Sequence, residues 1–277
     1  MEKVLKDIAE DGWLTSIRTY VPSAWIGHAP FLRYLIRDLR PKILVELGTH
    51  NGFSYFVGCQ TIQELGLSTK AYAVDHWMGD QHAGLFDDSV YQSVLQLNVP
   101  YQSFSKLLKM SFREARSQIT EPIDLLHIDG FHTYDAVKED FETWLPKMSK
   151  SGVIIMHDIH VRRADFGVHK LWKEIRSQYS TIEFTGSYGL GVVFMSNEIE
   201  CLSTLRHISN LGSLMQIQGV FGGLGDGVIQ QFRIVEEHRL EQKIAELTRE
   251  INLLVNSKSW RVTQPLRKIF SVVNRVR

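Results

Sequence analysis

From Pro41 onward, the hydrophobic positions alternate between short, almost continuously apolar runs and longer segments with helical spacing. Four such runs are KILVELG (42–48), KAYAVD (70–75), IDLLHID (123–129) and GVIIMHD (152–158). Runs of this length and composition are typical of parallel strands that are covered on both faces. Between the last two runs, apolar residues recur at helical spacing: Tyr134, Val137, Phe141 and Trp144. The pattern predicts an α/β fold in which a mostly parallel sheet is covered by crossover helices.

Two later runs, TIEFTG (181–186) and LGVVFMS (190–196), are separated by too few residues for a crossover helix. They predict an antiparallel hairpin at one edge of the sheet, which then ends near Ser196. We therefore expect three regions: a helical N-terminal cap (1–40), the α/β domain (41–198) and a helical extension (199–277).

The extension changes character twice, first to the glycine-rich patch GVFGGLGDG (219–227) and then to a helix with an apolar seam. The seam residues are spaced four, three, four and three apart: Leu240, Ile244, Leu247, Ile251 and Leu254. This spacing suits a coiled coil, but it lasts only about two heptads. Two interpretations remain open: a homo-oligomer through 232–256, or an amphipathic helix that packs on its own domain.

The last segment, KSWRVTQPLRKIFSVVNRVR (258–277), has six Lys or Arg residues and no acid, mixed with apolar and aromatic side chains. Such a segment predicts peripheral contact with an anionic membrane surface. A solvated tail, or one docked on a protein partner, is the alternative.

The composition excludes several classes of protein. The 31 basic and 31 acidic residues cancel, so the chain has no global signature of a nucleic-acid-binding protein. Two cysteines, Cys59 and Cys201, form neither a disulfide framework nor a metal-type spacing. The first residues carry acids where a signal peptide needs an apolar core, and no run is long enough to cross a membrane. We expect a cytoplasmic protein, peripheral on the inner face of the membrane if its tail binds there.

A glycine-rich turn follows the first strand in VELGTHNGFSYF (45–56), so backbone can approach a ligand and a helix N-terminus can face its negative group. The glycines Gly48 and Gly52 have GxxxG spacing rather than the GxGxxG of dinucleotide sites, which favours a carboxylate ligand over a diphosphate. Asp75 ends the second strand, where it can accept hydrogen bonds from ribose hydroxyls. An NAD-dependent oxidoreductase is therefore disfavoured.

With these motifs the chain resembles the class I S-adenosylmethionine-dependent methyltransferases, because VELGTHNGFS is similar to their first motif. The resemblance implies a Rossmann-like domain with a mostly parallel seven-stranded sheet and an antiparallel edge hairpin, and S-adenosyl-L-methionine as cofactor. It also implies that Asp75 binds the ribose, and Ser111 with Phe112 the adenine. The implied methionine-binding residues are Glu46, Gly48, Thr49, Gly52 and Ser54.

Two acids end apolar strands, Asp129 in LHIDGFHTYDAVKEDF (126–141) and Asp158 in MHDIH (156–160). Because parallel strands end at the same edge of a sheet, these carboxylates can share a cleft, where two hard oxygen ligands suit Mg²⁺ or a similar ion. Methyl transfer to a hydroxyl needs a general base or a metal that lowers the hydroxyl pKa. The two segments supply residues for both.

This arrangement is similar to that of metal-dependent O-methyltransferases of the catechol and macrolide-sugar types. The catechol type has a lysine base where His132 falls, so His132 is the candidate general base, with an ordinary histidine pKa near 6.5. The catechol type has an asparagine ligand where this chain has Ile159, and the sugar type has an acid where it has His157. We expect His157 as the third metal ligand, with His160 as the alternative, and a structural role for His127.

The segment VDHWMGDQHAGLF (74–86) predicts an acceptor loop, in which Trp77 and Phe86 stack on a sugar while Asp80 and His82 bind its hydroxyls; a lid packed on the core is the alternative. Together with SAWIGHAPF (23–31), DFGVHKLW (165–172) and EFTGSYGLGVVF (183–194), it resembles a branch common in bacterial surface-polysaccharide loci. The segment SKSWRVTQPLR (257–267) is similar to one in glycosyltransferases of such loci, which are the implied partners.

The resemblance implies an O-methyltransferase that acts on a sugar hydroxyl of a surface glycan or of its nucleotide- or lipid-linked precursor. A non-catalytic ligand-binding module that organises a glycan-assembly complex at the membrane is the alternative.

Overall fold

The structure is a computed structural model that describes residues 2–80, 84–85, 87–163, 165–196 and 211–263. Its contacts divide the chain into two units, Met1–Ile229 and Gln230–Arg277, and each is described by itself. The expected boundary between 198 and 199 lies outside the described residues, so the predicted three-region division stays a prediction.

The first unit contains a seven-stranded sheet with the order β5-β2-β1-β6-β7-β9-β8. Its strands are β1 (Ile43–Leu47), β2 (Lys70–Asp75), β5 (Ser105–Lys109), β6 (Ile123–Ile128), β7 (Met148–His157), β8 (Ser180–Phe184) and β9 (Leu190–Phe194). The five strands from β5 to β7 pair in parallel, whereas β9 pairs antiparallel with both β7 and β8. A separate antiparallel pair joins β3 (Gly79–Asp80) and β4 (Gly84–Leu85). The predicted Rossmann-like α/β fold with an antiparallel edge hairpin is confirmed.

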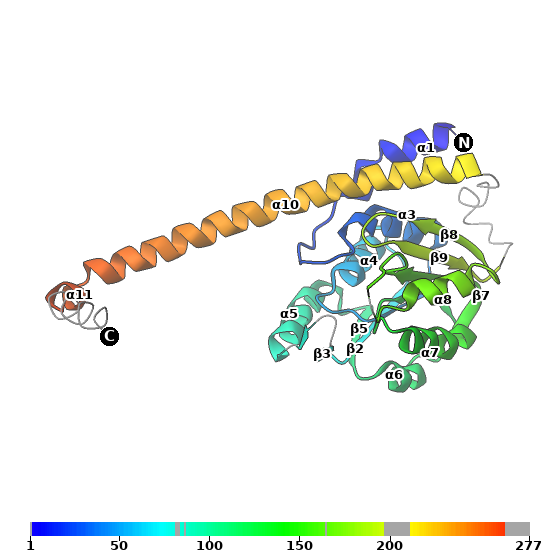
Figure 1. Ribbon diagram of the computed structural model, residues 1–277, viewed down its shortest axis with the longest axis horizontal. Coiled ribbons are helices and arrows are strands. Elements are labelled where there is room, and N and C mark those ends of the chain that lie inside the picture. The colour runs from blue at the N-terminus through cyan, green and yellow to red at the C-terminus, as the bar shows by residue number, and fades with distance from the viewer. Residues whose placement is uncertain (1, 81–83, 86, 164, 197–210, 264–277) are drawn as a thin grey trace. The chain divides into compact units, whose positions relative to one another are not determined.

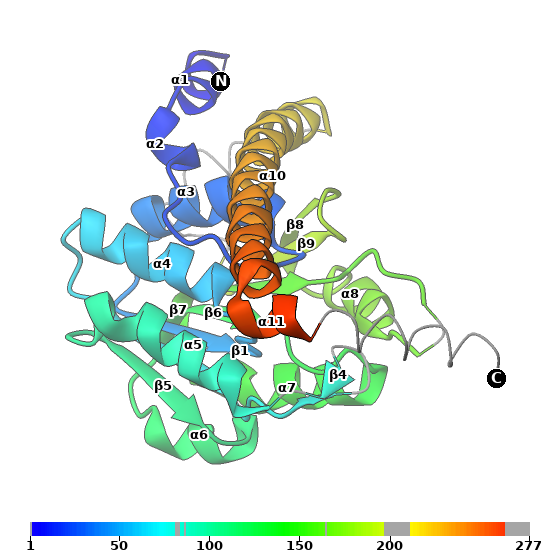
Figure 2. The same cartoon turned by 90° about the vertical axis from the view of Figure 1, so that its left-hand side faces the viewer.

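Helices cover both faces of the sheet (Figures 1 and 2). The contacts group α2 with α3 and α4 on one side, and α6 with α7 and α8 on the other. The described helices that precede α10 in the first unit are α1 (Glu2–Ala9), α2 (Gly12–Thr15), α3 (Ala29–Leu39), α4 (Phe53–Glu64), α5 (Asp88–Asn98), α6 (Phe112–Gln118), α7 (Tyr134–Trp144) and α8 (Val168–Ile175). Short 3-10 turns occupy Ile26–His28, Val99–Tyr101 and Leu145–Lys147.

Helix α7 has the bounds that its hydrophobic spacing predicts. The Thr133 side chain accepts a hydrogen bond from the Ala136 backbone N–H and so caps the helix. Loss of such a cap lowers the free energy of unfolding by about 1 kcal/mol. Its apolar face, formed by Val137, Phe141 and Trp144, is buried in the same core as β6 and β7. The cap and the buried face together fix the turn between β6 and α7, where the sequence places His132.

The sequence suggested that a helix begins only after the glycine-rich patch. In the structure the patch lies inside a helix, because α10 runs without a break from Leu211 to Asn256. Each helical glycine costs about 1 kcal/mol relative to alanine, but burial of apolar residues offsets that cost. Phe221 is buried, with its ring centroid 5.3 Å from that of Phe31 and 5.9 Å from that of Phe184. A Cβ on Gly225 would lie 2.2 Å from the carbonyl oxygen of Gly27, so a glycine here allows close backbone approach.

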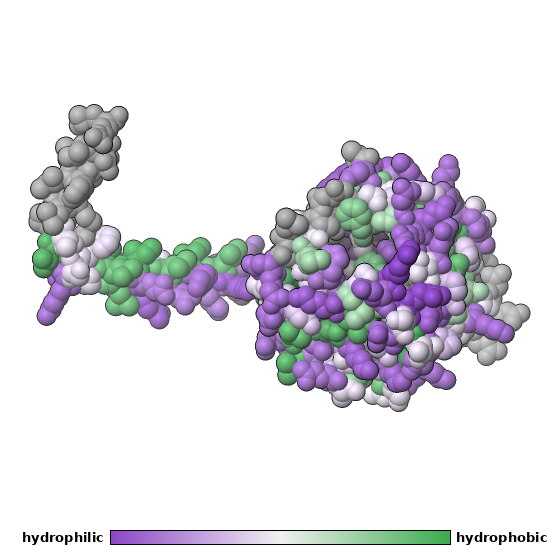
Figure 3. Space-filling model, turned by 90° about the horizontal axis from the view of Figure 1, so that it is seen from below, coloured by the Kyte–Doolittle hydropathy of each residue, from purple (hydrophilic) through white to green (hydrophobic). Residues whose placement is uncertain are grey.

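The second unit consists of the end of α10 and of α11 (Lys258–Val262). The side chains of the predicted seam are exposed: Leu240, Ile244, Leu247, Ile251 and Leu254. Figure 3 shows hydrophobic side chains gathered along one side of this helix and hydrophilic ones along the other. Among the described helices, none is both long and apolar enough to span a bilayer. Most of the basic segment 258–277 (264–277) lies outside the described residues.

Candidate functional site

A cavity of about 590 Å³ opens at the carboxyl ends of β1, β2, β6 and β7, the edge where the sequence predicts the site. Segments from six parts of the chain line it: 22–25, 48–54, 75–79, 111–113, 129–140 and 157–158. The glycine turn and the two strand-end acids therefore face one space, as expected for an open α/β sheet.

Gly48 brings the glycine turn against the end of β6. Its φ is +86°, and a Cβ at this position would lie 2.1 Å from the carbonyl oxygen of Asp129. Gly52 has φ +83° and is the N-cap residue of α4, where a Cβ would overlap the ring of Phe56. Both positions thus require glycine for the backbone conformation and for space. The turn presents the N-terminus of α4 to the cavity, which favours a negative ligand group.

A buried hydrogen-bond chain supports the first strand of the site. The Trp25 indole N–H donates to Nε2 of His127 at 3.1 Å, and Nδ1 of His127 donates to Oε2 of Glu46 at 2.7 Å. This chain fixes the tautomer and orientation of the imidazole, so His127 has the structural role that the sequence indicated.

Two buried acceptors beside the glycine turn have no hydrogen-bond partner among the described residues, Oε1 of Glu46 and Oγ1 of Thr49. Buried polar groups are normally paired, so these atoms fit a ligand that carries hydrogen-bond donors. Thr49 and Ser54 line the cavity, whereas Glu46 lies behind its wall and is buried. A direct contact between Glu46 and a ligand therefore stays a prediction.

Asp75 lines the cavity at the end of β2, as predicted. Its two carboxylate oxygens accept hydrogen bonds from the backbone N–H groups of His50 at 2.9 Å and of Trp77 at 2.7 Å. These bonds hold the carboxylate at the rim of the glycine turn, where each oxygen keeps a further lone pair for a ligand hydroxyl.

The prediction that Trp77 forms an open stacking surface for a sugar is wrong for this structure. Trp77 is only 2% exposed, its indole N–H donates to the carbonyl oxygen of His50, and its ring lies 4.8 Å from that of Tyr91. The backbone of Trp77 has a positive φ of 51°, which no local sequence pattern predicts for a tryptophan. The side chain of Asp80, together with His82 and Phe86, lies outside the described part of the acceptor loop.

At the opposite wall, Ser111 and Phe112 line the cavity where the resemblance implies adenine binding. The Ser111 hydroxyl takes part in a capping box with Glu114, so its side chain holds the start of α6 at the wall of the cavity. The ring of Phe112 packs on Gly130, at which a Cβ would come within 2.5 Å of that ring. Phe112 therefore forms an apolar wall suited to a flat base.

Asp140 lies between the apolar positions of α7, and it lines the same wall of the cavity. Burial, followed by the neighbouring charge of Glu139, raises the pKa of Asp140 to about 7. A lone acid in a helical pattern gives no signal of this, because the cavity is created by the packing of α7 against the β6 end.

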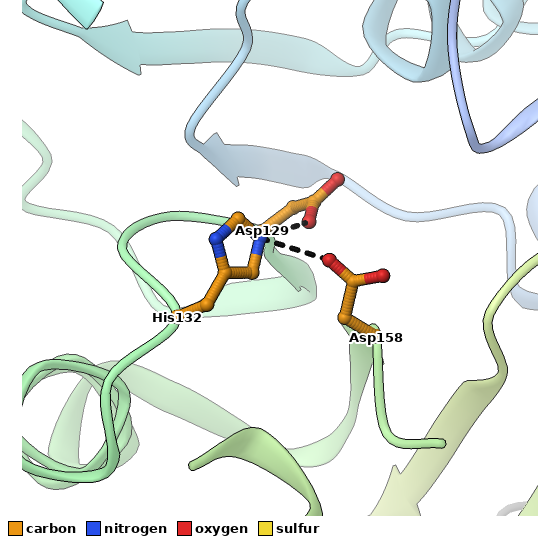
Figure 4. Close-up of side chains that lie close together, drawn as sticks. All are labelled: Asp129, His132 and Asp158. Carbon is orange, nitrogen blue, oxygen red and sulfur yellow. Dashed lines mark ion pairs between the residues drawn. The ribbon is translucent and has the colours of Figure 1, made fainter. Parts of the chain in front are cut away.

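Asp129, His132 and Asp158 form an acid–imidazole cluster (Figure 4). They come from the end of β6, the turn before α7 and the end of β7, and one ligand atom of each lies within 4.8 Å of the others. Nε2 of His132 is 2.9 Å from Oδ2 of Asp158 and 3.8 Å from Oδ1 of Asp129. Two carboxylates and an imidazole at this spacing are a donor set that a divalent cation can use.

His157 also faces the cluster. Its Nδ1 is 3.3 Å from Oδ1 of Asp129 and 3.5 Å from Oδ1 of Asp158, while its Nε2 donates to the carbonyl oxygen of Ser187 at 2.9 Å. The cluster within 4.8 Å contains His132 rather than His157, so the expected assignment of the imidazole ligand shifts toward His132. His160 is directed elsewhere and lines a separate groove.

The premise that His132 has an ordinary histidine pKa is wrong for the cluster as it stands. Burial lowers the pKa of His132, but hydrogen bonds to Asp129 and Asp158 and their negative charges outweigh burial and raise it to about 10. Burial favours the neutral form of Asp129, but the opposing effects of His157 and His132 lower the pKa of this carboxyl. At neutral pH His132 therefore holds a proton between two carboxylates and cannot accept another.

Comparisons with known proteins find one matching family model, a similar protein and similar solved structures. Residues 45–159, less than half of the chain, match the family model described as a methyltransferase domain. This segment begins in β1 and ends just after Asp158, so it contains the glycine turn and the acid–imidazole cluster. The first unit thus contains a segment that is similar to methyltransferase domains.

A protein of Sinorhizobium fredii (strain NBRC 101917 / NGR234), described as uncharacterized protein y4gI, is 45% identical over 178 residues. The match covers 64% of this chain and 20% of that protein, so the chain spans about a fifth of the length of this relative.

Similar solved structures include the O-methyltransferase TomG from Streptomyces achromogenes in complex with SAM, with 14% identity, a TM-score of 0.47, and 70% and 90% of the two chains covered. An O-methyltransferase from Bacillus cereus in complex with SAH has 16% identity and a TM-score of 0.45, with 70% and 91% covered. Identities this low assign no shared chemistry, and the fold is established by the sheet order itself.

Proposed function

We propose that this chain is an S-adenosylmethionine-dependent O-methyltransferase. The observation that carries the proposal is the single cavity that joins the glycine turn after β1, the acid at the end of β2 and the acid–imidazole cluster at the ends of β6 and β7. A methyl donor and a hydroxyl acceptor must meet in one enclosed space for in-line transfer, and this cavity provides both halves.

S-adenosylmethionine supplies an electrophilic methyl group when it is bound. The N-terminus of α4 favours the carboxylate of such a ligand, and the unpaired Oγ1 of Thr49 can accept a hydrogen bond from its ammonium group. Asp75 can accept hydrogen bonds from ribose hydroxyls. Phe112 and Asp140 border the space left for the base, so an exocyclic amine could donate to the Asp140 carboxyl.

The cluster is suited to a divalent cation, for which Asp129 and Asp158 would be the oxygen ligands and His132 or His157 the nitrogen ligand. Such an ion would lower the pKa of a bound hydroxyl. Asp129 and Asp158 would then share their negative charge with the ion and would no longer hold the proton on His132. If His157 is the nitrogen ligand, His132 remains free to serve as the general base that takes the acceptor proton, the role that the resemblance implies.

The proposed acceptor is a sugar hydroxyl of a surface glycan or of its nucleotide- or lipid-linked precursor. Its support is the similarity of the segments 23–31, 74–86, 165–172 and 183–194 to the polysaccharide-associated branch. Glycosyltransferase partners and membrane contact of the tail belong to the same proposal. A non-catalytic scaffold module is the second candidate, but the closely spaced Asp129, His132 and Asp158 favour an enzyme.

Calorimetry on the full chain with S-adenosylmethionine and, separately, with NAD tests the cofactor. We expect saturable binding of S-adenosylmethionine and none of NAD. Binding of NAD alone would refute the methyltransferase assignment and would indicate an oxidoreductase.

Chelation tests the role of the metal. Treatment with EDTA is expected to abolish methyl transfer while binding of S-adenosylmethionine survives, and added Mg²⁺ or Mn²⁺ should restore the activity. Full activity after chelation would remove the metal from the account.

A further inference from the structure

A second hollow, which we call the α8 groove, follows the outer face of α8 beside the loop after β7, and has a volume of about 1080 Å³. Six of its lining residues are basic or carry an imidazole: His160, Arg162, His169, Lys170, Lys173 and Arg176. Its two acids are Glu174 and Glu183. Positive groups therefore outnumber negative ones even when both histidines are neutral.

The two acids of the groove are already engaged. Glu183 accepts a hydrogen bond from the indole N–H of Trp172 at 2.7 Å and lies 3.6 Å from the Arg176 guanidinium. Glu174 accepts a hydrogen bond from the hydroxyl of Tyr134 at 2.9 Å.

Three cations remain without such a partner. Across the described ranges, no carboxylate lies within ion-pair distance of Arg162, Lys170 or Lys173. These three side chains are exposed, and Lys170 and Lys173 lie on the same helix, α8. The groove thus presents uncompensated positive charge to solvent.

The electrostatic state of His169 agrees with this picture. Burial lowers the pKa of His169, and the nearby charges of Arg162 and Lys170 lower it further. The charges of Arg162 and Lys170 therefore reach His169. A bound anion would balance these charges.

The groove adjoins the acid–imidazole cluster. Ile159, which lines it, directly follows Asp158 in the chain. The residues before α8 contact the cluster as well: the Gly167 backbone N–H donates to the carbonyl oxygen of His132 at 2.7 Å, and the Phe166 ring stacks on the His132 ring with centroids 4.7 Å apart. A ligand seated along α8 therefore has one end close to the proposed methyl-transfer site.

We propose that the α8 groove binds the phosphate or diphosphate group of the methyl acceptor, which makes the acceptor a sugar phosphate ester rather than a neutral glycan. The proposal rests on the proposed methyltransferase function and names its substrate class. The planar guanidinium of Arg162 can bind two phosphate oxygens at once, and Lys170 and Lys173 supply point charges beside it. A nucleotide-linked and a lipid-linked sugar share this diphosphate chemistry.

The test uses the full chain and a charge-reversal variant, Lys170→Glu with Lys173→Glu, and inorganic pyrophosphate as the probe in calorimetry at fixed ionic strength. The matched control is Lys42→Glu with Lys106→Glu, which reverses two exposed lysines outside the groove. We expect the groove variant to bind pyrophosphate at least about tenfold more weakly than the native chain, because two charge-assisted contacts are lost and replaced by like charges. The control variant should bind as the native chain does. Absence of pyrophosphate binding, or an equal loss in both variants, would overturn the proposal.

Two further probes, UDP-glucose and a short-chain polyprenyl diphosphate glucose, distinguish a nucleotide-linked from a lipid-linked source of the diphosphate. Tighter binding of either one than of pyrophosphate, with loss in the groove variant, supports an acceptor site and identifies its source. If neither binds more tightly than pyrophosphate, the groove does not serve the acceptor. These measurements need no methyl transfer, so they separate failure of the groove from failure of the proposed function, which shows itself as absence of S-adenosylmethionine binding.

Discussion

At the scale of single residues, Gly48 is the point where the glycine turn after β1 and the end of β6 meet. Its backbone lies against the carbonyl group of Asp129. The residue that starts the glycine turn is therefore also packed against the acid at the end of β6. The sequence identified Gly48 as a turn glycine, but the contact with Asp129 joins residues that are far apart in the chain and no local pattern shows it.

Substitution of Gly48 tests this contact. Gly48→Ala should lower the free energy of unfolding by about 2–4 kcal/mol and weaken S-adenosylmethionine binding, because strain at positive φ adds to a clash with backbone that cannot move aside. Gly66→Ala is the control, since Gly66 also has positive φ but open space around its missing Cβ. Urea unfolding measures both. Equal losses in the two variants would contradict a specific role for the contact.

Asp140 gives a pH-dependent prediction. Its pKa is raised from the model-peptide value of 3.8 to about 7, so the folded state keeps a proton that the unfolded chain releases as pH rises from about 4 to 7. Below pH 4 this carboxyl therefore does not lower the free energy of unfolding. Above pH 7 it lowers the free energy of unfolding by its full amount, up to about 4 kcal/mol.

Asp140→Asn should thus be more stable than the native chain at pH 8 and equal to it at pH 4, as measured by urea unfolding at both values. Asp135→Asn, an exposed acid on the same helix, should show no such gain at pH 8. A constant difference between Asp140→Asn and the native chain at the two pH values would contradict the raised pKa.

At the scale of elements, the strands and α7 could be predicted because burial on one or both faces leaves a direct periodic trace. The predicted runs at 70–75 and 123–129 match β2 and β6 to within one residue. The continuity of α10 through 219–227 could not be predicted, because glycine disfavours helix locally and the compensating contacts come from Phe31, Phe184 and Gly27 elsewhere in the chain.

The site likewise has residues whose positions the sequence predicts and residues whose environment it does not. Asp129 and Asp158 were predictable because the ends of parallel strands share one edge of a sheet. The burial of Trp77, the cavity position of Asp140 and the raised pKa of His132 depend on packing and charge pairs between separate segments, which the sequence does not display.

The seam of the second unit supports one prediction at this scale. If 232–256 forms a homo-oligomer, as its spacing suggests, Ile244→Asp should abolish concentration-dependent self-association in sedimentation velocity, because it places a charge in an apolar interface. Gln242→Asp, an exposed position off the seam, should leave association unchanged. A monomeric native chain at all concentrations would contradict the homo-oligomer and would favour a partner or the chain itself as the cover of the seam.

At the scale of the whole molecule, the sheet delivers the glycine turn, Asp75 and the acid–imidazole cluster to one cavity, and the α8 groove begins at the residue that follows Asp158 in the chain. The catalytic account does not require the seam of the second unit or the basic segment at 258–277, and partners for both stay predictions. The central claim is therefore confined to the first unit: its cavity transfers a methyl group to a hydroxyl.

The most direct test is transfer of a radiolabelled methyl group from S-adenosylmethionine to polysaccharide or lipid-linked sugar extracts of the source cell, followed by sugar analysis. The native chain should yield an O-methylated sugar. Asp158→Asn, which keeps a residue tolerant of the φ of +60° at this position, should lower the rate by about 100-fold or more while it still binds S-adenosylmethionine. An unchanged rate in Asp158→Asn, or no label in any sugar despite cofactor binding, would contradict the account.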